Sequence, residues 1–547
     1  MFRPGARTPT ATAWVAVAAI VCGVGCEALR TPVRDGAFIR DPLGPPPTLP
    51  VLGPPPAIPD TPAPNANPDG TPKPVPVAID GPLTLPQVLD SVGRSFPLLL
   101  AIQEQQAIAT GNRLAAEGQF DLTLRTGLNN NEGSFGNTRY DLVFEQPTPF
   151  NGASFFAGYR LGMGDFPVYY GDRKTGSGGE YRAGFQVPLL RDGPIDRRRA
   201  ALRQAQILEQ LADPVIRRNR LDYYRAAARA YWAWVASGEQ YRIARALYDT
   251  TDDLQRFLQG RLDAGAEDSV NVERNRQVLL ERQNIVVSAE RAYQRAAYEL
   301  SLYHRDANGD PLLPRPEQLP PDFYATDPVP VGLSTKDADV VTALESRPEL
   351  DRFRLEKAGV AVDLQLATNQ FYPGLNVGAN VAQDAGSSKK SFTGTGIFAS
   401  DASSANVFVT FDLPLQRRGA RGDVLRHQAR LRQLLLNEEW AQNLIRNEVL
   451  DALADMDRAS ERLTVARREQ AVAESVLANE VKRLVGRADV LAVNIRQFQA
   501  AQARARVAGA LADFYRAFAD YQAALGREGG VPKTEPAKPP KIDEPRK

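Results

Sequence analysis

The sequence predicts a mixed α+β protein built from two copies of one structural repeat, and three observations support this. The motif FQVPLLRDG at 185–193 returns as FDLPLQRRG at 411–419. Polar and apolar residues alternate upstream of each motif, as expected of strands with two different faces. Downstream of each motif, a stretch of about 65 residues is rich in strong helix formers. The chain is therefore expected to contain two copies of a unit made of paired strands and very long helices.

The first 82 residues are predicted to lie outside the repeats. Arg3 and Arg7 precede an uncharged apolar run, which is typical of a secretory signal over 1–25. A short membrane anchor is the alternative reading of this run. Cys26 follows small residues, as at a bacterial lipidation site, and its acylation would tether the N-terminus to a membrane. The Pro-rich segment 26–82 is expected to be an extended linker.

The remaining chain divides into two repeats, a connecting loop and a tail. Each repeat is expected to contain a helix of about 30 residues, alternating strands, a very long helix, a tight turn and a returning helix of about 40 residues. The first repeat has about 25 extra residues, predicted to form a hairpin that projects outward or extends existing strands. The boundaries are 83–305 for the first repeat, 306–336 for the inter-repeat loop, 337–527 for the second repeat and 528–547 for a disordered charged tail.

Neither the strands nor the helices of one copy are expected to be stable alone. Two strands in the main hairpin are too few for an independent sheet, and their edges invite pairing with other chains. A helical hairpin about 100 Å long also needs neighbours, although Leu511, Tyr515 and Phe518 form a coiled-coil-like stripe. Pro214 is expected to kink or interrupt the first long helix. We therefore expect a cyclic oligomer in which several chains close one barrel.

Composition and motifs argue against an enzyme and against a nucleic-acid binder. The 66 basic residues balance the 65 acidic ones, and no phosphate loop, dinucleotide fingerprint or nucleophile elbow occurs. His304 and His427 lie far apart without cysteines at ligand spacing, so no metal or other cofactor is expected. The basic stretch RRRAALRQ at 197–204 is expected on a solvated helix face or beside lipid headgroups.

Several quoted segments carry a family resemblance. LTLPQVLDSVGRSFPLLLAIQ, the repeated F-x-x-P-L motif with its Gly, and the helix tips DAGAEDSVNVERNR and VGRADVLAVNIRQ resemble the TolC-like outer-membrane factor family over 83–527. The resemblance implies a homotrimer in the outer membrane of a Gram-negative-type bacterium. Each protomer would add four strands to a twelve-stranded transmembrane β-barrel, which continues into a periplasmic coiled-coil barrel of α-helices.

The same resemblance implies a function. Family members are outer-membrane exit ducts of tripartite efflux systems, which export small molecules with a periplasmic adaptor and an inner-membrane transporter of the RND or ABC type. An exit duct for type I protein secretion has the same fold and is an alternative. A non-conducting coiled-coil scaffold of the envelope is an alternative of another class, against which the recurring alternating strands argue.

The family's pattern places functional residues at the periplasmic tip. Asp489 falls on a carboxylate that rings the entrance and would concentrate cations there. Alternatively, Asp489 only caps the returning helix. Ala492 occupies the position of a second ring carboxylate, so that ring is missing. In the first repeat, the corresponding aspartate position falls on Asn271, and Arg276 matches a tip arginine.

Glycines and prolines mark two further regions. Gly265 and Gly486 are expected at the hairpin tips, where a turn requires positive φ and where adaptors dock in the family. At the strand-to-helix junctions, Pro is suited to the end of strand pairing and Gly to a sharp change of direction. These junction residues are Pro188 and Gly193 in the first repeat and Pro414 and Gly419 in the second.

Overall fold

The computed structural model of this chain divides into two compact units, Met1–Pro72 and Lys73–Lys547. The structure describes residues 81–166, 174–321, 323–324, 326–329, 335–386, 403–487, 490–530, 532 and 534–536, all of which belong to the second unit. The predicted signal segment, Cys26 and almost all of the Pro-rich linker lie outside the described residues. The second unit is described by itself below.

Each repeat begins with a helix that is broken at a proline, where a single continuous helix was expected. In the first repeat α2 (Leu85–Ser95) is followed by α3 (Pro97–Glu117), and in the second α6 (Lys336–Ser346) is followed by α7 (Pro348–Asn369). The residue before each proline is extended, with ψ of 116° at Phe96 and 122° at Arg347. The proline ring disfavours the helical region for the residue before it but suits the first helical position.

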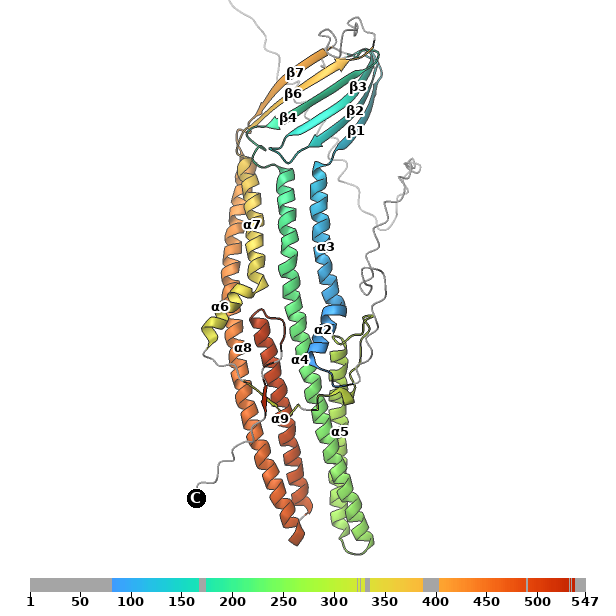
Figure 1. Ribbon diagram of the computed structural model, residues 1–547, viewed down its shortest axis with the longest axis vertical. Coiled ribbons are helices and arrows are strands. Elements are labelled where there is room, and N and C mark those ends of the chain that lie inside the picture. Colours follow the sequence, from blue (N-terminus) through green and yellow to red (C-terminus); the bar gives the residue numbers. More distant parts are fainter. Residues whose placement is uncertain are drawn as a thin grey trace, which may run out of the picture. The chain divides into compact units, whose positions relative to one another are not determined.

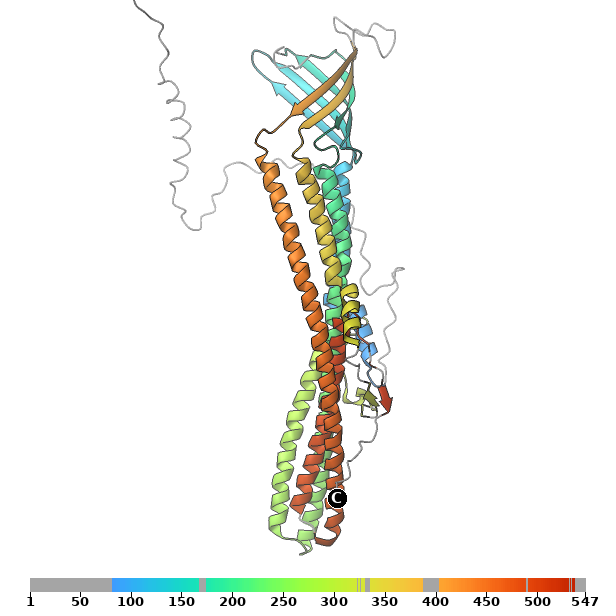
Figure 2. The ribbon, with the colours of Figure 1, turned by 90° about the vertical axis from the view of Figure 1, so that its left-hand side faces the viewer.

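The four long helices occur in the predicted order (Figure 1), and the two returning helices, of 33 and 35 residues, are shorter than the 40 expected. α4 (Arg197–Asp263) returns as α5 (Ser269–Ser301), and α8 (Arg418–Arg487) returns as α9 (Val490–Ala524). Figure 2 shows these two hairpins, green and orange-red, descending side by side, and α4 packs along α9. No helix within the described ranges is both long enough and apolar enough to cross a bilayer.

Pro214 does not interrupt α4, contrary to the sequence expectation. The helix continues through Pro214, which is buried. A proline removes one backbone donor and crowds the preceding turn. α4 is held along its length by α3 and α7 as well as by α5 and α9. Packing on several sides therefore outweighs the local cost of the proline.

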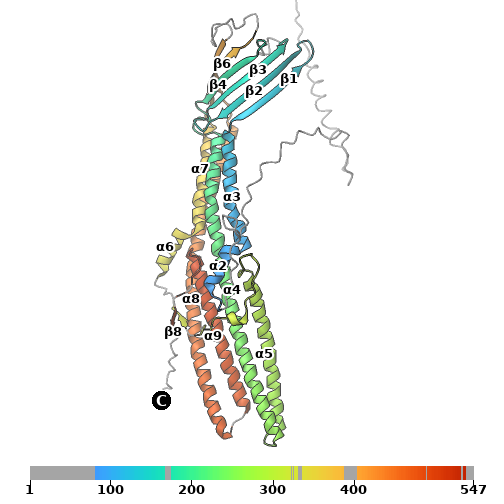
Figure 3. The same cartoon turned by 45° about the vertical axis from the view of Figure 1, so that its right-hand side comes forward.

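Six of the strands in the described residues form one antiparallel sheet, in the order β1-β2-β3-β4-β6-β7. Figure 3 shows the strands labelled from β6 to β1 in this order. The extra hairpin predicted in the first repeat exists, but it is inserted into the sheet between β1 and β4 and does not project outward. Each chain therefore has six strands in this sheet, where the resemblance implied four. The strands are β1 (Thr123–Asn131), β2 (Asn137–Pro147), β3 (Ser154–Gly164), β4 (Glu180–Pro188), β6 (Gly374–Asp384) and β7 (Ser403–Asp412).

The inter-repeat loop and the predicted tail carry structure that their composition does not indicate. β5 (Thr326–Pro328) pairs antiparallel with β8 (Thr534–Pro536), which lies inside the segment expected to be disordered. The loop also contains the short helix η3 (Pro316–Gln318), and it buries Leu319 and Phe323 in the core. A ladder of three residues needs only backbone groups, so the polar side chains of the tail do not prevent it.

The core lies where the broken helices meet the two long hairpins. Trp232 of α4 stacks on Tyr515 of α9, with ring centroids 3.9 Å apart and planes inclined by 10°. The predicted stripe of Leu511, Tyr515 and Phe518 is buried here. Other side chains without exposed surface come from α2, α3, α4, α5, α8 and α9: Val88, Val92, Leu99, Trp234, Leu300, Val449, Val507 and Phe514.

The two helix breaks occupy equivalent positions in the two repeats, but different types of side chain pack into them. The spacing of 251 residues that relates Pro97 to Pro348 also relates Phe96 to Arg347. Phe96 is buried between Tyr223 and Tyr303, at centroid distances of 5.1 and 5.4 Å. One apolar ring thus closes the break of the first repeat.

Arg347 closes the break of the second repeat with hydrogen bonds. It is 4% exposed and donates to the carbonyl oxygens of Ala523 and Ala524 at the end of α9, at 3.1 and 3.3 Å. It also pairs with Glu448 of α8 at 2.6 Å. The C-terminal carbonyls of a helix lack partners within the helix, so this guanidinium ties α7 to α8 and α9.

Arg347→Ala is expected to lower the free energy of unfolding by about 2–4 kcal/mol, because buried carbonyls of α9 and the carboxylates of Glu349 and Glu448 lose this donor. The measurement is the guanidinium unfolding midpoint of the full chain in detergent. Arg352→Ala is the matched control in the adjoining helix α7, since its side chain is exposed where it pairs with Glu356 and ion pairs of exposed side chains contribute little. Equal destabilisation by both variants would contradict this role for Arg347.

Candidate functional site

One face of the sheet is apolar across all six strands and is exposed. The register of each strand pair places every second residue on this face. A folded protein in water rarely exposes a continuous apolar surface of this extent. One exposed apolar residue from each strand, in sheet order, is Leu124, Tyr140, Phe155, Tyr181, Val381 and Val407.

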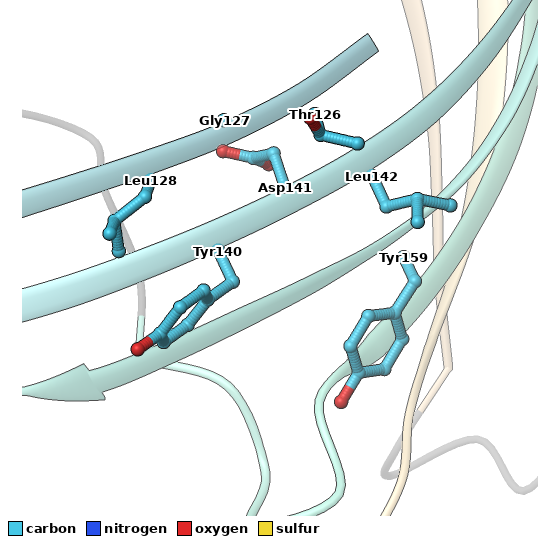
Figure 4. A pocket seen from close by; sticks show the side chains of 7 residues that line it. All are labelled: Thr126, Gly127, Leu128, Tyr140, Asp141, Leu142 and Tyr159. Atoms are coloured by element: carbon cyan, nitrogen blue, oxygen red, sulfur yellow. The ribbon is translucent and has the colours of Figure 1, made fainter. Parts of the chain in front are cut away.

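Figure 4 shows the apolar face near β1, where Leu128, Tyr140 and Tyr159 project to one side of the sheet and Asp141 to the other. Further along the same face, a groove of about 720 Å³ runs from β2 to β7. Small side chains, among them Ala157 and Ala183, form its floor between rows of larger ones. The surface is therefore uneven and mainly apolar.

The opposite face of the sheet carries ion pairs between neighbouring strands. Arg125 of β1 lies 3.0 Å from Glu145 of β2, and Arg160 of β3 lies 2.9 Å from Glu180 of β4. Opposite charges that face each other across strands stabilise a sheet and keep a surface compatible with water. The two faces of the sheet thus suit two different solvents.

Asp141 links β2 to β4 on this polar face, across the intervening strand β3. It pairs with Arg139 of its own strand at 2.6 Å and with Arg182 of β4 at 3.2 Å. Arg182 reaches β2 across Gly158 of β3, its partner in register. A Cβ at Gly158 would lie 2.6 Å from the carbonyl oxygen of Leu142, so this crossing requires glycine.

At the junctions between the sheet and the long helices, the residues that turn the chain are not the predicted ones. Pro188 is the last residue of β4, and Pro414 follows β7 by two residues. Positive φ occurs at Asp192 (67°) and Arg417 (49°), not at the predicted glycines. Gly419 lies in the first turn of α8, with open space where a Cβ would stand.

Glycine is needed at position 193 for a different reason, which is that the backbone of Pro188 approaches it closely. A Cβ there would lie 3.1 Å from the carbonyl oxygen of Pro188. Arg199 then fastens this turn, donating to the carbonyl oxygens of Asp192 at 2.6 Å and Gly193 at 2.7 Å. Arg199 is held in turn by Asp196, the N-cap of α4, at 2.8 Å. The turn between FQVPLLRDG and α4 is thus stabilised by side-chain hydrogen bonds from Arg199.

At the other end of α4, the first-repeat tip is a tight acidic turn. Gly265 has φ of 68°, and nothing lies within 4 Å of the place a Cβ would take. Asp268 caps α5 by accepting a hydrogen bond from the N–H of Val270 at 3.0 Å. Asn271 donates to Glu267 at 2.9 Å. This bond, together with the N–H of Asp268, lowers the pKa of the Glu267 carboxyl.

Arg276 lies one turn further along α5 and is exposed, 3.8 Å from Glu273. In the second repeat, Gly486 lies in the last turn of α8, and α9 begins at Val490. Asp489 lies outside the described residues. The spacing of 222 residues that relates Arg261 to Arg483 relates Glu267 to Asp489. The repeat therefore pairs Asp489 with a carboxylate, where the family pattern paired it with Asn271.

The two hairpins meet through a buried polar layer that sequence reasoning missed. Asn494 of α9 donates to Asn275 of α5 at 3.0 Å, and Asn275 donates to Gln255 of α4 at 2.7 Å. Asn275 and Asn494 are 1% and 4% exposed. Polar residues at buried helix–helix positions set register at a cost in stability.

Arg282 extends this layer by two helical turns. Its guanidinium lies over the ring of Phe498, 3.9 Å from the centroid. In the part of the chain that the structure describes, no carboxylate lies within ion-pair distance of it, and burial lowers its pKa. Val272, Asn275 and Arg282 are spaced like the core positions of a coiled-coil heptad. Polar residues at positions that are normally apolar are the feature of the sequence that could have predicted this layer.

The two histidines lie in different parts of the fold. Burial lowers the pKa of His304 in the core region. His427 lies on α8 with its Nδ1 3.9 Å from Asp363. Among the described residues, no cluster of three or more His, Cys, Asp or Glu side chains is placed to hold a metal ion.

Comparisons with known proteins identify the fold. No protein-family profile and no curated protein sequence matches the chain. Several solved structures share its architecture over 81% of its length. They include the outer-membrane channel OprN (16% identity, TM-score 0.56, 90% of that chain covered), the outer membrane protein VceC of Vibrio cholerae (15%, 0.57, 96%) and the open state of the MtrE outer membrane channel of Neisseria gonorrhoeae (14%, 0.55, 89%). The predicted fold class of long helices joined to a sheet is thereby confirmed.

The buried polar layer predicts a coupled pair of mutations. Asn494→Leu should destabilise the contact between α5 and α9 by about 1–3 kcal/mol, because the Asn275 carbonyl loses its donor inside the protein. The double variant Asn275→Leu/Asn494→Leu should recover part of this loss, since neither asparagine is left behind and only the half-buried Gln255 loses a donor. Amide hydrogen exchange along α5 and α9 reports the local stability.

Asn284→Leu is the control, because it makes the same change on the exposed side of α5 and should alter stability by less than about 0.5 kcal/mol. A double variant whose loss equals the sum of the single losses would show that Asn275 and Asn494 act independently.

Proposed function

We propose that this chain, which has the fold of the TolC-like outer-membrane channels, belongs to that family and is the outer-membrane exit duct of a tripartite efflux system. The observation that carries the proposal is the two-faced sheet. Its apolar face suits lipid, and its ion-paired face suits a water-filled lumen. Strands of 9 to 11 residues also match the length that crosses a bilayer.

The sheet edges support a closed homotrimer. β1 and β7 have one hydrogen-bonded neighbour each within the chain. Open edges do not occur in the hydrocarbon region of a membrane, because every backbone group there needs a partner. β7 of one copy and β1 of the next satisfy this need by closing a ring. The long hairpins then lie next to one another below the ring and surround a periplasmic tunnel.

The partners in this proposal are a periplasmic adaptor, which docks at the tips around Gly265 and Gly486, and an inner-membrane transporter of the RND or ABC type. Small molecules are the proposed cargo, as in the efflux ducts of the family. A duct for type I secretion uses the same fold and is the second candidate. The exposed apolar face of the sheet disfavours a non-conducting scaffold, which has no need of a lipid-facing surface.

Carboxylates are proposed to select cations at the periplasmic entrance. Glu267 and Asp489 occupy equivalent places in the two repeats, so three copies bring two rings of carboxylates to the tips. The lowered pKa of Glu267 keeps it ionised at neutral pH. A ring of like charges concentrates counter-ions at an opening. At the other end of the chain, Cys26 is proposed to be acylated, with the Pro-rich linker giving it reach.

The proposal predicts discrete conductance steps from the purified protein in planar bilayers, with a preference for cations. Asp489→Ala and Glu267→Gln should each weaken the preference, and the double variant should weaken it further, because each removes a ring of charge. Asp253→Asn is the control, since this exposed carboxylate lies on α4 outside the tip turn. Steps that the tip variants leave unchanged would keep the duct and remove these carboxylates from its entrance.

The pH dependence of Asp489→Ala isolates Glu267. The folded pKa of Glu267 lies below the ordinary 4.5, so its charge is present above that value and is lost only as the pH falls below it. The cation preference of this variant should therefore persist from pH 7 to 4.5 and decline at lower pH. A decline centred above pH 4.5, measured as reversal potential in a salt gradient, would contradict this assignment.

A further inference from the structure

The inserted hairpin of the first repeat is fully integrated into the sheet. β2 pairs with β1 from Thr123↔Glu145 to Asn131↔Asn137, over the whole length of β1. β3 pairs with β4 from Ser154↔Gln186 to Arg160↔Glu180. Both ladders are continuous, so the hairpin separates β1 from β4 along the height of the sheet. A hairpin that only extended existing strands would leave β1 paired with β4.

The hairpin also shares the solvent preference of its neighbours. On the apolar face, exposed Leu142 and Phe144 of β2 and Phe155 of β3 continue the row of large side chains from β1 to β4. A hairpin outside the membrane would gain nothing from this apolar surface. The alternation therefore places β2 and β3 at the same membrane depth as the flanking strands.

On the polar face, ion pairs join the hairpin to the strands on either side. Glu145 of β2 pairs with Arg125 of β1, and Asp141 of β2 pairs with Arg182 of β4. The proposed lumen surface is thus continuous through the insertion, with basic and acidic groups balanced along it.

The number of strands also permits closure. Neighbouring strands are antiparallel throughout, and the six strands end with β7 antiparallel to β1. β7 of one copy can therefore pair antiparallel with β1 of the next at every seam. All nine residues of β1 are exposed in the single chain, which leaves this edge available.

We infer that the outer-membrane end of the duct is an eighteen-stranded barrel, formed by three copies of six strands, and that it does not limit the size of the cargo. This rests on the trimer of the proposed function. At equal strand tilt, the width of a barrel grows in proportion to strand number, so eighteen strands give about 1.5 times the diameter of twelve. Barrels of this size hold an aqueous channel, so cargo as bulky as the helical tunnel admits passes freely.

The test compares the full chain with a variant that lacks 137–164, the residues of β2 and β3 and their turn. Removing two strands keeps the antiparallel order, because β1 and β4 run in opposite directions. Native mass spectrometry gives the number of chains, and electron microscopy of the detergent-solubilised protein gives the barrel diameter. We expect trimers in both cases and a diameter ratio of about 1.5.

Polymer exclusion in planar bilayers provides the functional measurement. Uncharged polyethylene glycols added on the barrel side should enter the full-length channel up to a hydrodynamic radius about 1.5 times that for the deletion variant. A full-length trimer with twelve strands in its barrel would overturn the inference, as would a dimer that closes twelve strands. Either result leaves a conducting duct intact. An eighteen-stranded trimer that does not conduct, even with its adaptor, would instead overturn the proposed function.

A pair of adjacent substitutions tests the hairpin without deleting it. Leu142→Arg places a charge on the lipid face, and we expect the yield of folded trimer in membranes to fall on the order of tenfold. Val143→Glu places a charge on the polar face directly opposite Arg125, and it should leave the yield within about twofold. Equal yields from both variants would place the hairpin outside the membrane and overturn the inference.

Discussion

The need to satisfy every backbone hydrogen bond of the sheet is the constraint on which this architecture depends. The six strands pair with one another, yet β1 and β7 each keep one open side. In water, charged side chains could protect such edges, but the exposed apolar face of the sheet points to lipid, where an unpaired edge is not tolerated. In the proposed trimer, β7 of one copy pairs with β1 of the next, so that no edge is left open. The long helices and the junction corners hold the six strands of each chain in place for this pairing.

The duplication of the chain places the same helix break, before a proline, in two different environments. Phe96 and Arg347 stand at equivalent helix breaks, and each fills its break completely. Phe96 does so with ring contacts to Tyr223 and Tyr303. Arg347 lies where α9 ends, so its guanidinium meets carbonyl oxygens that would otherwise lack donors. The local fold is thus conserved between repeats while the interaction that stabilises it has changed from dispersion to hydrogen bonding.

Stability is distributed unevenly along the long hairpins. Near the helix breaks, the aromatic cluster around Trp232 and Tyr515 packs tightly. Toward the tips, α5 and α9 meet through Asn275, Asn494 and Arg282, whose burial costs free energy that polar contacts only partly offset. Glu267, which is proposed to line the entrance, lies in the tip turn beyond this layer. The hairpins are therefore held less firmly toward this tip than around the aromatic cluster, which suits the proposed entrance of a duct.

The sequence by itself determined the long helices, the strand segments and the duplication, because these follow from local periodicity and helix propensity over many residues. It also predicted the extra hairpin, which follows from the alternation of polar and apolar residues in RYDLVFEQ at 139–146 and SFFAGYRLG at 154–162. Only the tertiary structure decided that this hairpin enters the sheet between β1 and β4, since pairing partners depend on register across distant segments. The same holds for α4 continuing through Pro214, for the β5–β8 pair and for Asn275 meeting Asn494. In each case contacts between segments far apart in the chain outweigh a local preference, and no short stretch of sequence contains that information.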